Sequence, residues 1–274
     1  MVHFLKMNGN GNDFVIIDNR QEKIEITPKI ASWIGYRRYG IGCDQLILLE
    51  DSNNADIFMR IYNADGSESG ACGNATRCVA DLLMRETGKP QASIETRAGV
   101  LTGVRAGENE VTVNMGEPSL DWQKIPLSED LDVMRLPISV GPLSGPTAVG
   151  MGNPHMVFFV EDISKIRLRN FGSELENNPL FPQKANVTIA TIRSREYIAT
   201  KVWERGVGKT LACGTAACAT LVAAVLHDLV EPKAVIEQPG GTLKIEWLEN
   251  GQILMTGKAS YSYEGDFDLA TAMK

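Results

Sequence analysis

The chain has 274 residues, with 27 Lys or Arg against 34 Asp or Glu, so its formal net charge is −7. This acidic balance disfavours nonspecific binding to nucleic acid, because no excess of basic side chains is available to displace counterions from a phosphate backbone. A chain of this length buries about 75% of its unfolded surface, so neither disulfides nor a structural metal is needed for folding. Any chemical role of its five cysteines therefore needs its own explanation.

The N-terminus, Met-Val-His-Phe-Leu-Lys-Met-Asn-Gly, has polar and glycine residues where a signal peptide needs an apolar run. Nowhere do about 18 apolar residues run together, so no membrane-spanning helix is predicted. We therefore expect a cytoplasmic protein whose thiols stay reduced.

Two cysteine-containing stretches resemble each other at an offset of 141 residues. Residues 71–78 read Ala-Cys-Gly-Asn-Ala-Thr-Arg-Cys, and residues 212–218 read Ala-Cys-Gly-Thr-Ala-Ala-Cys. The same offset sets Gly11-Asn12 over Gly152-Asn153 and Gln45 over Asn186. Matches that keep one order and one offset predict two related halves. The joint is expected near 117–145, a stretch with several prolines and an acidic run.

Each half is predicted to contain strands and one apolar helix. Residues 14–17, 57–62 and 111–115 are short, rich in β-branched or aromatic side chains and bounded by Gly, Asn or Asp, which indicates strands. Helices are expected from 74 to about 85 and from 215 to about 229, both without interior Gly or Pro. The second helix is apolar on every face and should be enclosed. We therefore predict an α+β fold in which a β-sheet wraps around a central helix in each half.

The cysteines at the two helix starts are the candidates for chemistry. Free N–H groups at a helix start stabilise an anion, so we expect them to lower the pKa of the Cys72 and Cys213 thiols and to bind a carboxylate. If the halves face each other across a cleft, one thiol removes a proton from a carbon and the other returns one on the opposite face. The alternative for either cysteine alone is a buried small hydrophobe.

A metal site is the next alternative for the cysteines. Five residues separate Cys72 from Cys78, and four separate Cys213 from Cys218, which lies outside or at the edge of compact zinc spacing. On a helix, positions five or six apart diverge around the axis. We therefore expect Cys78 and Cys218 in the core. Cys43 has no counterpart in the second half.

Tight turns are expected to place Asn12 and Asn153 toward the cleft. The alternative is that both Asn residues only form turns and have no binding role. The halves differ where Glu204-Arg205 replaces Asn63-Ala64. Arg205 is suited to a bidentate pair with a carboxylate, and Glu204 and His155 to tuning a thiol, while purely structural or surface roles are equally open.

Seven motifs of the chain belong together. They are Gly-Asn-Asp-Phe (11–14), Tyr-Asn-Ala-Asp-Gly-Ser (62–67), Ala-Cys-Gly-Asn with Arg77-Cys78, Asn-Met-Gly-Glu-Pro (114–118), Gly-Asn-Pro-His (152–155), Glu-Arg-Gly (204–206) and Ala-Cys-Gly-Thr (212–215). As a set they resemble the motifs of the diaminopimelate epimerase family. The resemblance covers nearly the whole chain. It implies an epimerase without a cofactor or metal that converts the small molecule LL-2,6-diaminopimelate to its meso form, for lysine and peptidoglycan synthesis.

The resemblance also assigns roles to residues. Cys72 and Cys213 are the acid and base, with Cys213 as the base in the LL-to-meso direction. Gly73, Asn74, Gly214 and Thr215 hold the reacting carboxylate, and His155 and Glu204 adjust the thiol pKa values. The remaining substrate contacts are Asn12, Gln45, Asn63, Asn153, Asn186, Glu204 and Arg205. The family implies a homodimer whose subunits each have two domains, here 1–117 and 118–262, with the tail 263–274 returning to the first.

Three points remain open from the sequence. Asn8, Asn10, Ala75 and Ala216 depart from the commoner family pattern, which leaves the loop shape undetermined. A proline or hydroxyproline racemase of the same fold is the nearest alternative, but its substrate has one carboxylate and gives Arg205 no role. A thiol redox or metal-binding module is the alternative from a different class.

Overall fold

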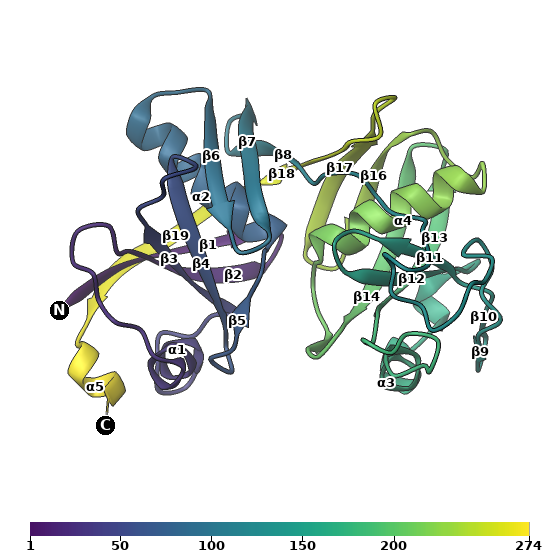
Figure 1. Ribbon diagram of the computed structural model, residues 1–274, viewed down its shortest axis with the longest axis horizontal. Coiled ribbons are helices and arrows are strands. Elements are labelled where there is room, and N and C mark those ends of the chain that lie inside the picture. The colour runs from purple at the N-terminus through teal and green to yellow at the C-terminus, as the bar shows by residue number, and fades with distance from the viewer. Residues whose placement is uncertain (274) are drawn as a thin grey trace. The chain divides into compact units, whose positions relative to one another are not determined.

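The computed structural model describes residues 1–273, which form two compact units (Figure 1). The first unit holds 1–113 together with 257–274, of which Lys274 lies outside the described residues, and the second holds 114–256. The sequence boundaries at 117 and 262 lie close to these positions. The first unit is thus built from both ends of the chain.

The first unit contains mainly strands. They are β1 (Val2–Gly9), β2 (Asn12–Asp18), β3 (Gln45–Glu50), β4 (Ile57–Asn63), β5 (Glu68–Ser69), β6 (Gln91–Thr96), β7 (Gly99–Gly107), β8 (Glu110–Asn114) and β19 (Ser260–Phe267). Its helices are α1 (Pro28–Gly35), α2 (Gly73–Thr87) and α5 (Leu269–Met273).

The second unit repeats this plan. Its strands are β9 (Ser139–Val140), β10 (Leu143–Ser144), β11 (Thr147–Gly150), β12 (Pro154–Phe159), β13 (Asn186–Ser194), β14 (Tyr197–Glu204), β15 (Gly208–Lys209), β16 (Lys233–Gln238), β17 (Gly241–Trp247) and β18 (Ile253–Lys258), whose last two residues belong to the first unit. Its helices are α3 (Gly172–Glu176), α4 (Gly214–Leu226) and two 3₁₀ turns, Ile163–Lys165 and Leu168–Asn170.

Strand pairing is the same in both units, which confirms the predicted repeat. In the first, β1 pairs antiparallel with β2, β2 parallel with β3, β3 antiparallel with β4, and β4 parallel with β6. The second has the same senses from β11 through β12, β13, β14 and β16. Even the register agrees, because Phe14 pairs with Gln45 and His155 pairs with Asn186, both 141 residues further on.

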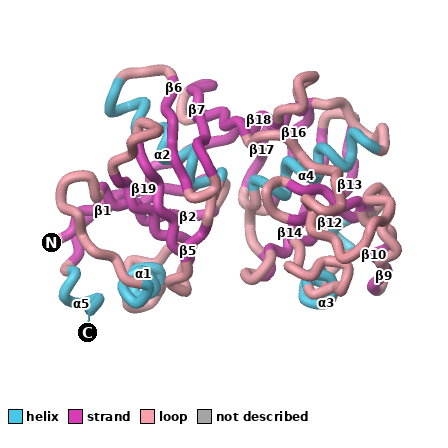
Figure 2. Tube along the Cα trace, viewed as in Figure 1, coloured by secondary structure: helices cyan, strands magenta, loops and turns pink. Residues whose placement is uncertain are grey.

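One helix lies among the strands of each unit, as expected (Figure 2). Helix α2 packs on β1, β6 and β7, and it ends at Gly88, whose φ of 72° is the left-handed C-cap conformation. Strand β7 passes so close to α2 that a Cβ at Gly103 would lie 2.4 Å from the Cβ of Ala80. Helix α4 is buried at almost every position up to Ala224, which confirms that it is enclosed.

The cysteines that were expected in the core are there. Cys78 and Cys218 are fully buried, and Cys43 is buried beneath β3 and α1. All five cysteines are free thiols. Among residues 1–273, no helix is long and apolar enough to cross a membrane.

The proline-containing stretch 117–145 lies within the second unit rather than between the two. Ile125 and Leu136 in this stretch are buried at 0% and 1% exposure, and they pack with Phe158 of β12 and Ile189 of β13. The prolines interrupt regular structure without preventing this packing. The apolar residues between them supply part of the core of the second unit.

The C-terminal strand returns to the first unit. Strand β19 pairs antiparallel with β1, with Val2 opposite Phe267 and Leu5 opposite Glu264. Phe267 also packs against Phe4 and Trp33. The two ends of the chain therefore hold one sheet together.

Candidate active site

Polar side chains collect at one edge of the sheet in the first unit. Strand β2 begins at Asn12, β3 begins at Gln45 and β4 ends at Asn63. Because β2 and β3 are parallel and β4 is antiparallel to β3, these three ends meet at the same edge. The turn before Asn12 uses the positive φ of Asn10 (57°) and Gly11 (80°), a conformation that Asn tolerates and Gly favours.

Cys72 is the N-cap of α2 and has an extended backbone (φ −150°). Gly73 and Asn74 are the first residues of the helix, which begins one residue before its predicted start. The Cys72 thiol is half-buried and donates to Oδ1 of Asn12 at 3.7 Å, and Nδ2 of Asn74 donates to the same oxygen at 3.3 Å. The structure thus brings Cys72, Asn12 and Asn74 together.

Gln45 and Asn63 form a neighbouring pair. Nε2 of Gln45 donates to Oδ1 of Asn63 at 3.0 Å, and Nδ2 of Asn63 donates to Ser67 Oγ at 3.0 Å. These contacts join the two residues to each other rather than to Cys72. They fix the amide of Asn63 at the end of β4.

Cys213 occupies the corresponding place in the second unit, as the N-cap of α4, with Gly214 and Thr215 opening the helix. Its thiol lies 3.5 Å from Oγ1 of Thr215. Gln238 clamps its backbone from both sides, because Oε1 accepts from Cys213 N and Nε2 donates to Cys213 O, both at 3.1 Å. Cys213 is only 7% exposed, in contrast to half-buried Cys72.

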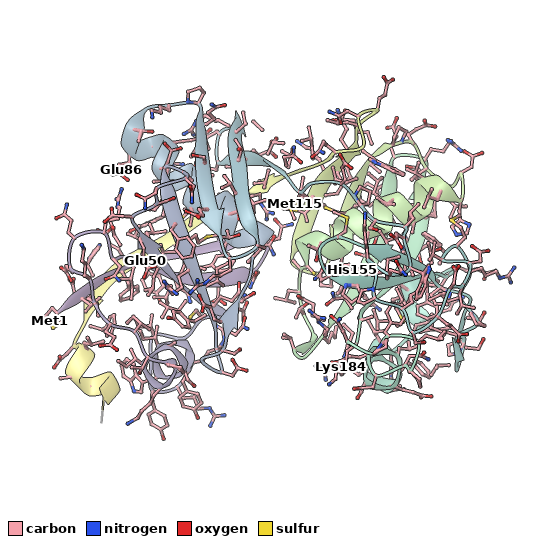
Figure 3. The ribbon with its side chains drawn as sticks, viewed as in Figure 1. Met1, Glu50, Glu86, Met115, His155 and Lys184 are labelled. Carbon is pink, nitrogen blue, oxygen red and sulfur yellow. The ribbon has the colours of Figure 1, made fainter. Side chains whose placement is uncertain are left out.

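His155 lies on β12 (Figure 3). It is in contact with Asn153. Its Nε2 is 2.8 Å from Asn153 Oδ1, while Nδ2 of Asn153 donates to Thr215 Oγ1 at 3.4 Å. His155 is fully buried, and this burial, together with the positive charge of Arg205, lowers its pKa to about 3. A neutral imidazole therefore supports Asn153 next to the start of α4.

Glu204 and Arg205 follow at the end of β14, in the place of Asn63 and Ala64. The buried amide of Asn186 holds this end, because its Oδ1 accepts from Arg205 N at 2.9 Å and its Nδ2 donates to Pro154 O at 3.1 Å. The Arg205 guanidinium donates to Gln183 O at 3.0 Å. Together with Asn153 and Lys124, Arg205 lines a cavity of about 260 Å³ with an excess of positive charge.

The predicted lowering of the Cys213 pKa is wrong. Burial, followed by the negative charge of Glu204, raises the pKa of the Cys213 thiol well above its usual value. The hydrogen bonds from Thr215 and from the backbone of Ala216 lower it, but they offset only part of the rise. The N–H groups at a helix start lower the pKa of a nearby thiol, but here desolvation of the sulfur raises the pKa by more.

Sequence reasoning missed two residues, one that contacts Cys213 and one that contacts Asn12. Gln238 corresponds to Thr96 of the first half at an offset of 142, and this change of residue type within the repeat is a signal that was available. Asp44 precedes Gln45, but only the folded chain shows its bond to Asn12. Within residues 1–273, no three His, Cys, Asp or Glu side chains cluster closely enough to hold a metal ion.

The architecture, two units each with one helix enclosed by strands, defines a known class of fold. A phenazine biosynthesis protein of the PhzF family from Bacillus anthracis matches with a TM-score of 0.69 at 18% identity, over 97% of this chain and 99% of that chain. A hydroxyproline epimerase from Agrobacterium vitis matches with a TM-score of 0.68 at 13% identity, over 96% and 90%. The chain thus has the PhzF and proline racemase-like fold.

Sequence comparison narrows this class. The family model described as diaminopimelate epimerase matches residues 4–120 and 147–262. The diaminopimelate epimerases of Acidiphilium cryptum and Rhodospirillum centenum are each 48% identical, over 97% and 96% of this chain and 96% and 91% of their own. The chain belongs to the diaminopimelate epimerase family.

The buried His155 should make folding sensitive to acid. Below about pH 6.5 the unfolded chain binds a proton at this histidine that the folded chain, with a pKa of about 3, does not bind. Its contribution is thus present above pH 6.5 and is lost as the pH falls, by about 1.4 kcal/mol per pH unit. We expect His155→Gln to reduce the pH dependence of the free energy of unfolding by this amount, measured by denaturant unfolding from pH 6.5 to 4.5.

The control for this experiment is His3→Gln, which removes a histidine that is more than half exposed and lies 3.2 Å from Asp266. That variant should change the pH dependence less than His155→Gln does. Equal slopes for His155→Gln and the wild type would mean that the buried imidazole carries a proton in the folded chain.

Proposed function

We propose that this chain is a two-thiol epimerase that interconverts LL- and meso-2,6-diaminopimelate, a step toward lysine and peptidoglycan precursors. The observation that carries the proposal is the repeat itself, because each unit presents one cysteine at the start of its enclosed helix. Inverting a carbon centre needs a base that removes a proton and an acid that delivers one to the other face. Two thiols in equivalent frames supply both groups.

In the LL-to-meso direction, the Cys213 thiolate takes the proton from the α-carbon. The C–H bond breaks, its electron pair stays on the carbon, and Cys213 becomes a thiol. Cys72 then donates its proton to the carbon and becomes a thiolate. Because its pKa is raised in the free chain, Cys213 is a thiol there, and it must lose its proton before it can act as this base.

The helix starts stabilise the charge that develops on the reacting carboxylate. The backbone N–H groups of Gly73 and Asn74 on α2, and of Gly214 and Thr215 on α4, lie in the first turn and have no partner within the helix. Such groups bind a carboxylate, and they stabilise it more strongly as negative charge moves onto it from the carbon.

Diaminopimelate carries a second carboxylate, and we assign it to Arg205. The supporting observation is the cavity that Arg205 shares with Asn153 and Lys124, because it offers two positive groups and amide donors to an anion. Asn186 holds the backbone of Arg205, and Asn12, Gln45, Asn63 and Glu204 complete the substrate contacts. A substrate with one carboxylate, such as proline, leaves Arg205 unused.

The thiol chemistry balances with no cofactor, and we propose that none is used. His155 and Glu204 tune the thiols in this proposal. Glu204 does so through its charge next to Cys213, and neutral His155 does so by holding Asn153 beside Thr215. We further propose that the protein works in the cytoplasm, on the basis of the family resemblance.

Loss of either thiol should stop epimerisation. We expect Cys72→Ala and Cys213→Ala each to lower kcat/KM for LL-diaminopimelate at least about a hundredfold, because general acid–base groups contribute about 10² to 10⁴. In deuterated water, early product of the wild type should carry deuterium at the inverted carbon, since the delivered proton comes from a thiol that exchanges with solvent. Mass spectrometry of product and residual substrate measures this.

Cys218→Ala is the matched control, because Cys218 lies on α4 five residues after Cys213 and is fully buried in the core. This variant should keep its activity with some loss of stability. Near wild-type turnover in either helix-start variant, or early product that retains the substrate hydrogen, would contradict the two-thiol mechanism.

Arg205→Lys should raise KM for diaminopimelate about tenfold or more, because a lysine cannot form the forked pair that a guanidinium makes with a carboxylate. Steady-state kinetics measure this, with Arg193→Lys on exposed β13 sequence as the control that should change nothing. Turnover of proline at a rate equal to that of diaminopimelate would overturn the assignment of substrate.

The family resemblance also supports a homodimer. The chain has a mass of 29.9 kDa, so sedimentation equilibrium of the wild type should give about twice this value. A monomer mass that does not change with protein concentration would contradict this.

A further inference from the structure

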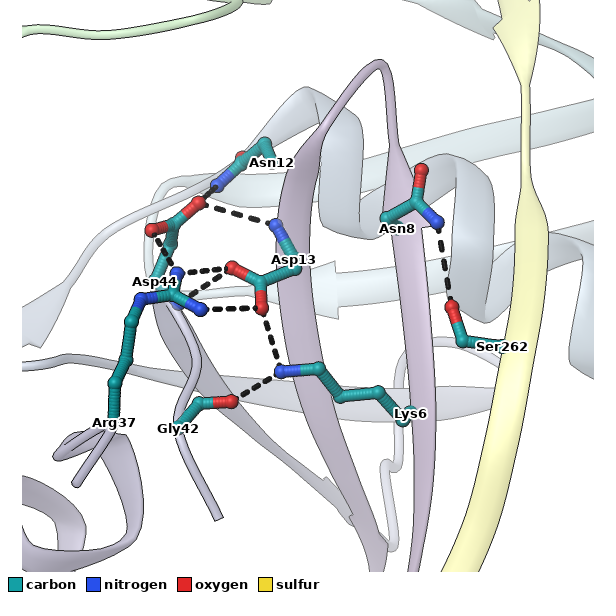
Figure 4. A network of polar contacts seen from close by, with 8 residues as sticks. All are labelled: Lys6, Asn8, Asn12, Asp13, Arg37, Gly42, Asp44 and Ser262. Carbon is teal, nitrogen blue, oxygen red and sulfur yellow. Dashed lines mark hydrogen bonds and ion pairs between the residues drawn. The ribbon is translucent and has the colours of Figure 1, made fainter. Parts of the chain in front are cut away.

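Four charged side chains next to Asn12 form one network, which we call the Asp44 cluster. Its members are Lys6, Asp13, Arg37 and Asp44 (Figure 4). Arg37 forks onto Asp13, with bonds of 3.0 and 2.6 Å, and also reaches Asp44 at 2.8 Å. Lys6 Nζ lies 2.6 Å from Asp13 and also donates to Gly42 O. Asp13 and Asp44 also exchange bonds between backbone and carboxylate, each at 3.1 Å.

These contacts hold the cluster in place and keep Asp13 ionised. Burial alone would raise the pKa of Asp13, but hydrogen bonds and charge from Arg37 and Lys6 hold it well below its usual range. The Lys6 side chain is only 9% exposed, so its ammonium group stays bonded to Asp13 and Gly42 rather than to water. The carboxylate of Asp44 is thus held in place by Arg37 and by the backbone of β2.

Asp44 determines which end of the Asn12 amide faces the thiol. Its Oδ2 accepts from Nδ2 of Asn12 at 3.0 Å. An ionised carboxylate only accepts hydrogen bonds, so the NH₂ group of Asn12 must face Asp44. The oxygen of Asn12 therefore faces Cys72 and Asn74, at 3.7 and 3.3 Å.

The second unit orients its equivalent amide the other way. At the offset of 141, the four cluster positions hold uncharged residues: Thr147, Pro154, Asn178 and Ala185. Asn153 turns its oxygen to Nε2 of His155 and its NH₂ group to Thr215 at the start of α4. Equivalent asparagines thus present an acceptor to one helix start and a donor to the other.

We propose that Asp44 is a positioning residue that, with Lys6, Asp13 and Arg37, locks Asn12 so that its oxygen accepts the thiol hydrogen of Cys72. An acceptor stabilises S–H and not a thiolate. The cluster therefore favours the protonated form of Cys72, which is the form a proton donor needs. This inference rests on the proposed two-thiol function and deepens it.

Other ionisable groups lie on the elements around Cys72. Helix α2 carries Arg77, whose Nε donates to Lys258 O at 3.4 Å, and Cys78, for which burial raises the pKa to about 12. Cys78 thus stays a thiol at neutral pH. The charges of the cluster lie on β1, on β2 and on the segment before β3. Of these, only Asp44 bonds the Asn12 side chain.

The test measures the protonation of Cys72 directly, without turnover. Iodoacetamide reacts with the thiolate, so the rate of alkylation at Cys72, followed by mass spectrometry of the intact chain's peptides, gives a pH midpoint. In Asp44→Asn the amide at 44 both donates and accepts, and the lock on Asn12 is lost. We expect the midpoint to fall by about one pH unit.

The control and the double variant separate positioning from other causes. Asp18→Asn is the matched control, because Asp18 ends the same strand and is also held by an arginine, Arg20, and it should leave the midpoint unchanged. In an Asn12→Ala background, Asp44→Asn should have no further effect. A full shift in that background would mean that the Asp44 charge acts on Cys72 directly, and it would overturn the proposal.

A second variant keeps the proposal testable if Asp44→Asn fails to fold. Arg37→Lys keeps the positive charge but loses the fork onto the two carboxylates, and it should shift the midpoint in the same direction by less. An unchanged midpoint in either folded variant would overturn the proposal. Because alkylation needs no substrate, this result is independent of whether the chain epimerises diaminopimelate.

Discussion

The unsatisfied N–H groups at the start of an enclosed helix are the constraint on which both halves of this molecule depend. The first four amides of any α-helix lack partners within the helix, and Ser, Thr, Asp or Asn at the N-cap usually supplies one. Here the N-caps are Cys72 and Cys213 rather than one of these residues. Glycine follows each cysteine, so the first turn stays open to an approaching carboxylate.

The strands fix where those helix starts lie. In each unit, three strand ends lie at one edge of the sheet: the beginning of the second strand, the beginning of the third and the end of the fourth. The cysteine at the helix start lies at the same edge. A duplicated frame therefore places corresponding side chains at corresponding positions. The units differ in the groups that contact these side chains. Asn12 contacts a charged cluster, and Asn153 contacts a buried neutral histidine.

Much of this organisation could be predicted from the sequence. The repeat, the α+β class, the two helices and the buried Cys78 and Cys218 follow from local composition and from the offset, because these features depend on near neighbours. The packing of 117–145 on the second unit could not be predicted in this way, since prolines signal irregular backbone but not whether the apolar residues between them are buried.

The contacts of Asp44 and Gln238 were also beyond the sequence. Each bonds a residue 32 or 25 positions away, so its partner is known only once strand pairing is known. The predicted pKa of Cys213 was wrong for a related reason. A helix start is visible in the sequence, whereas the depth of burial of the sulfur and its proximity to Glu204 depend on the whole unit.

A duplicated fold poses a chemical difficulty for a two-thiol epimerase, because catalysis needs one thiol protonated and the other ionised at the same moment. Identical environments would give both cysteines the same proton affinity. The two units avoid this equality by different means: Cys213 is buried next to a carboxylate, and Cys72 is half-exposed and bonded to an amide oxygen that an ionised network holds in place. Divergence of the residues around the cysteines, rather than of the cysteines themselves, therefore gives the two thiols different proton affinities.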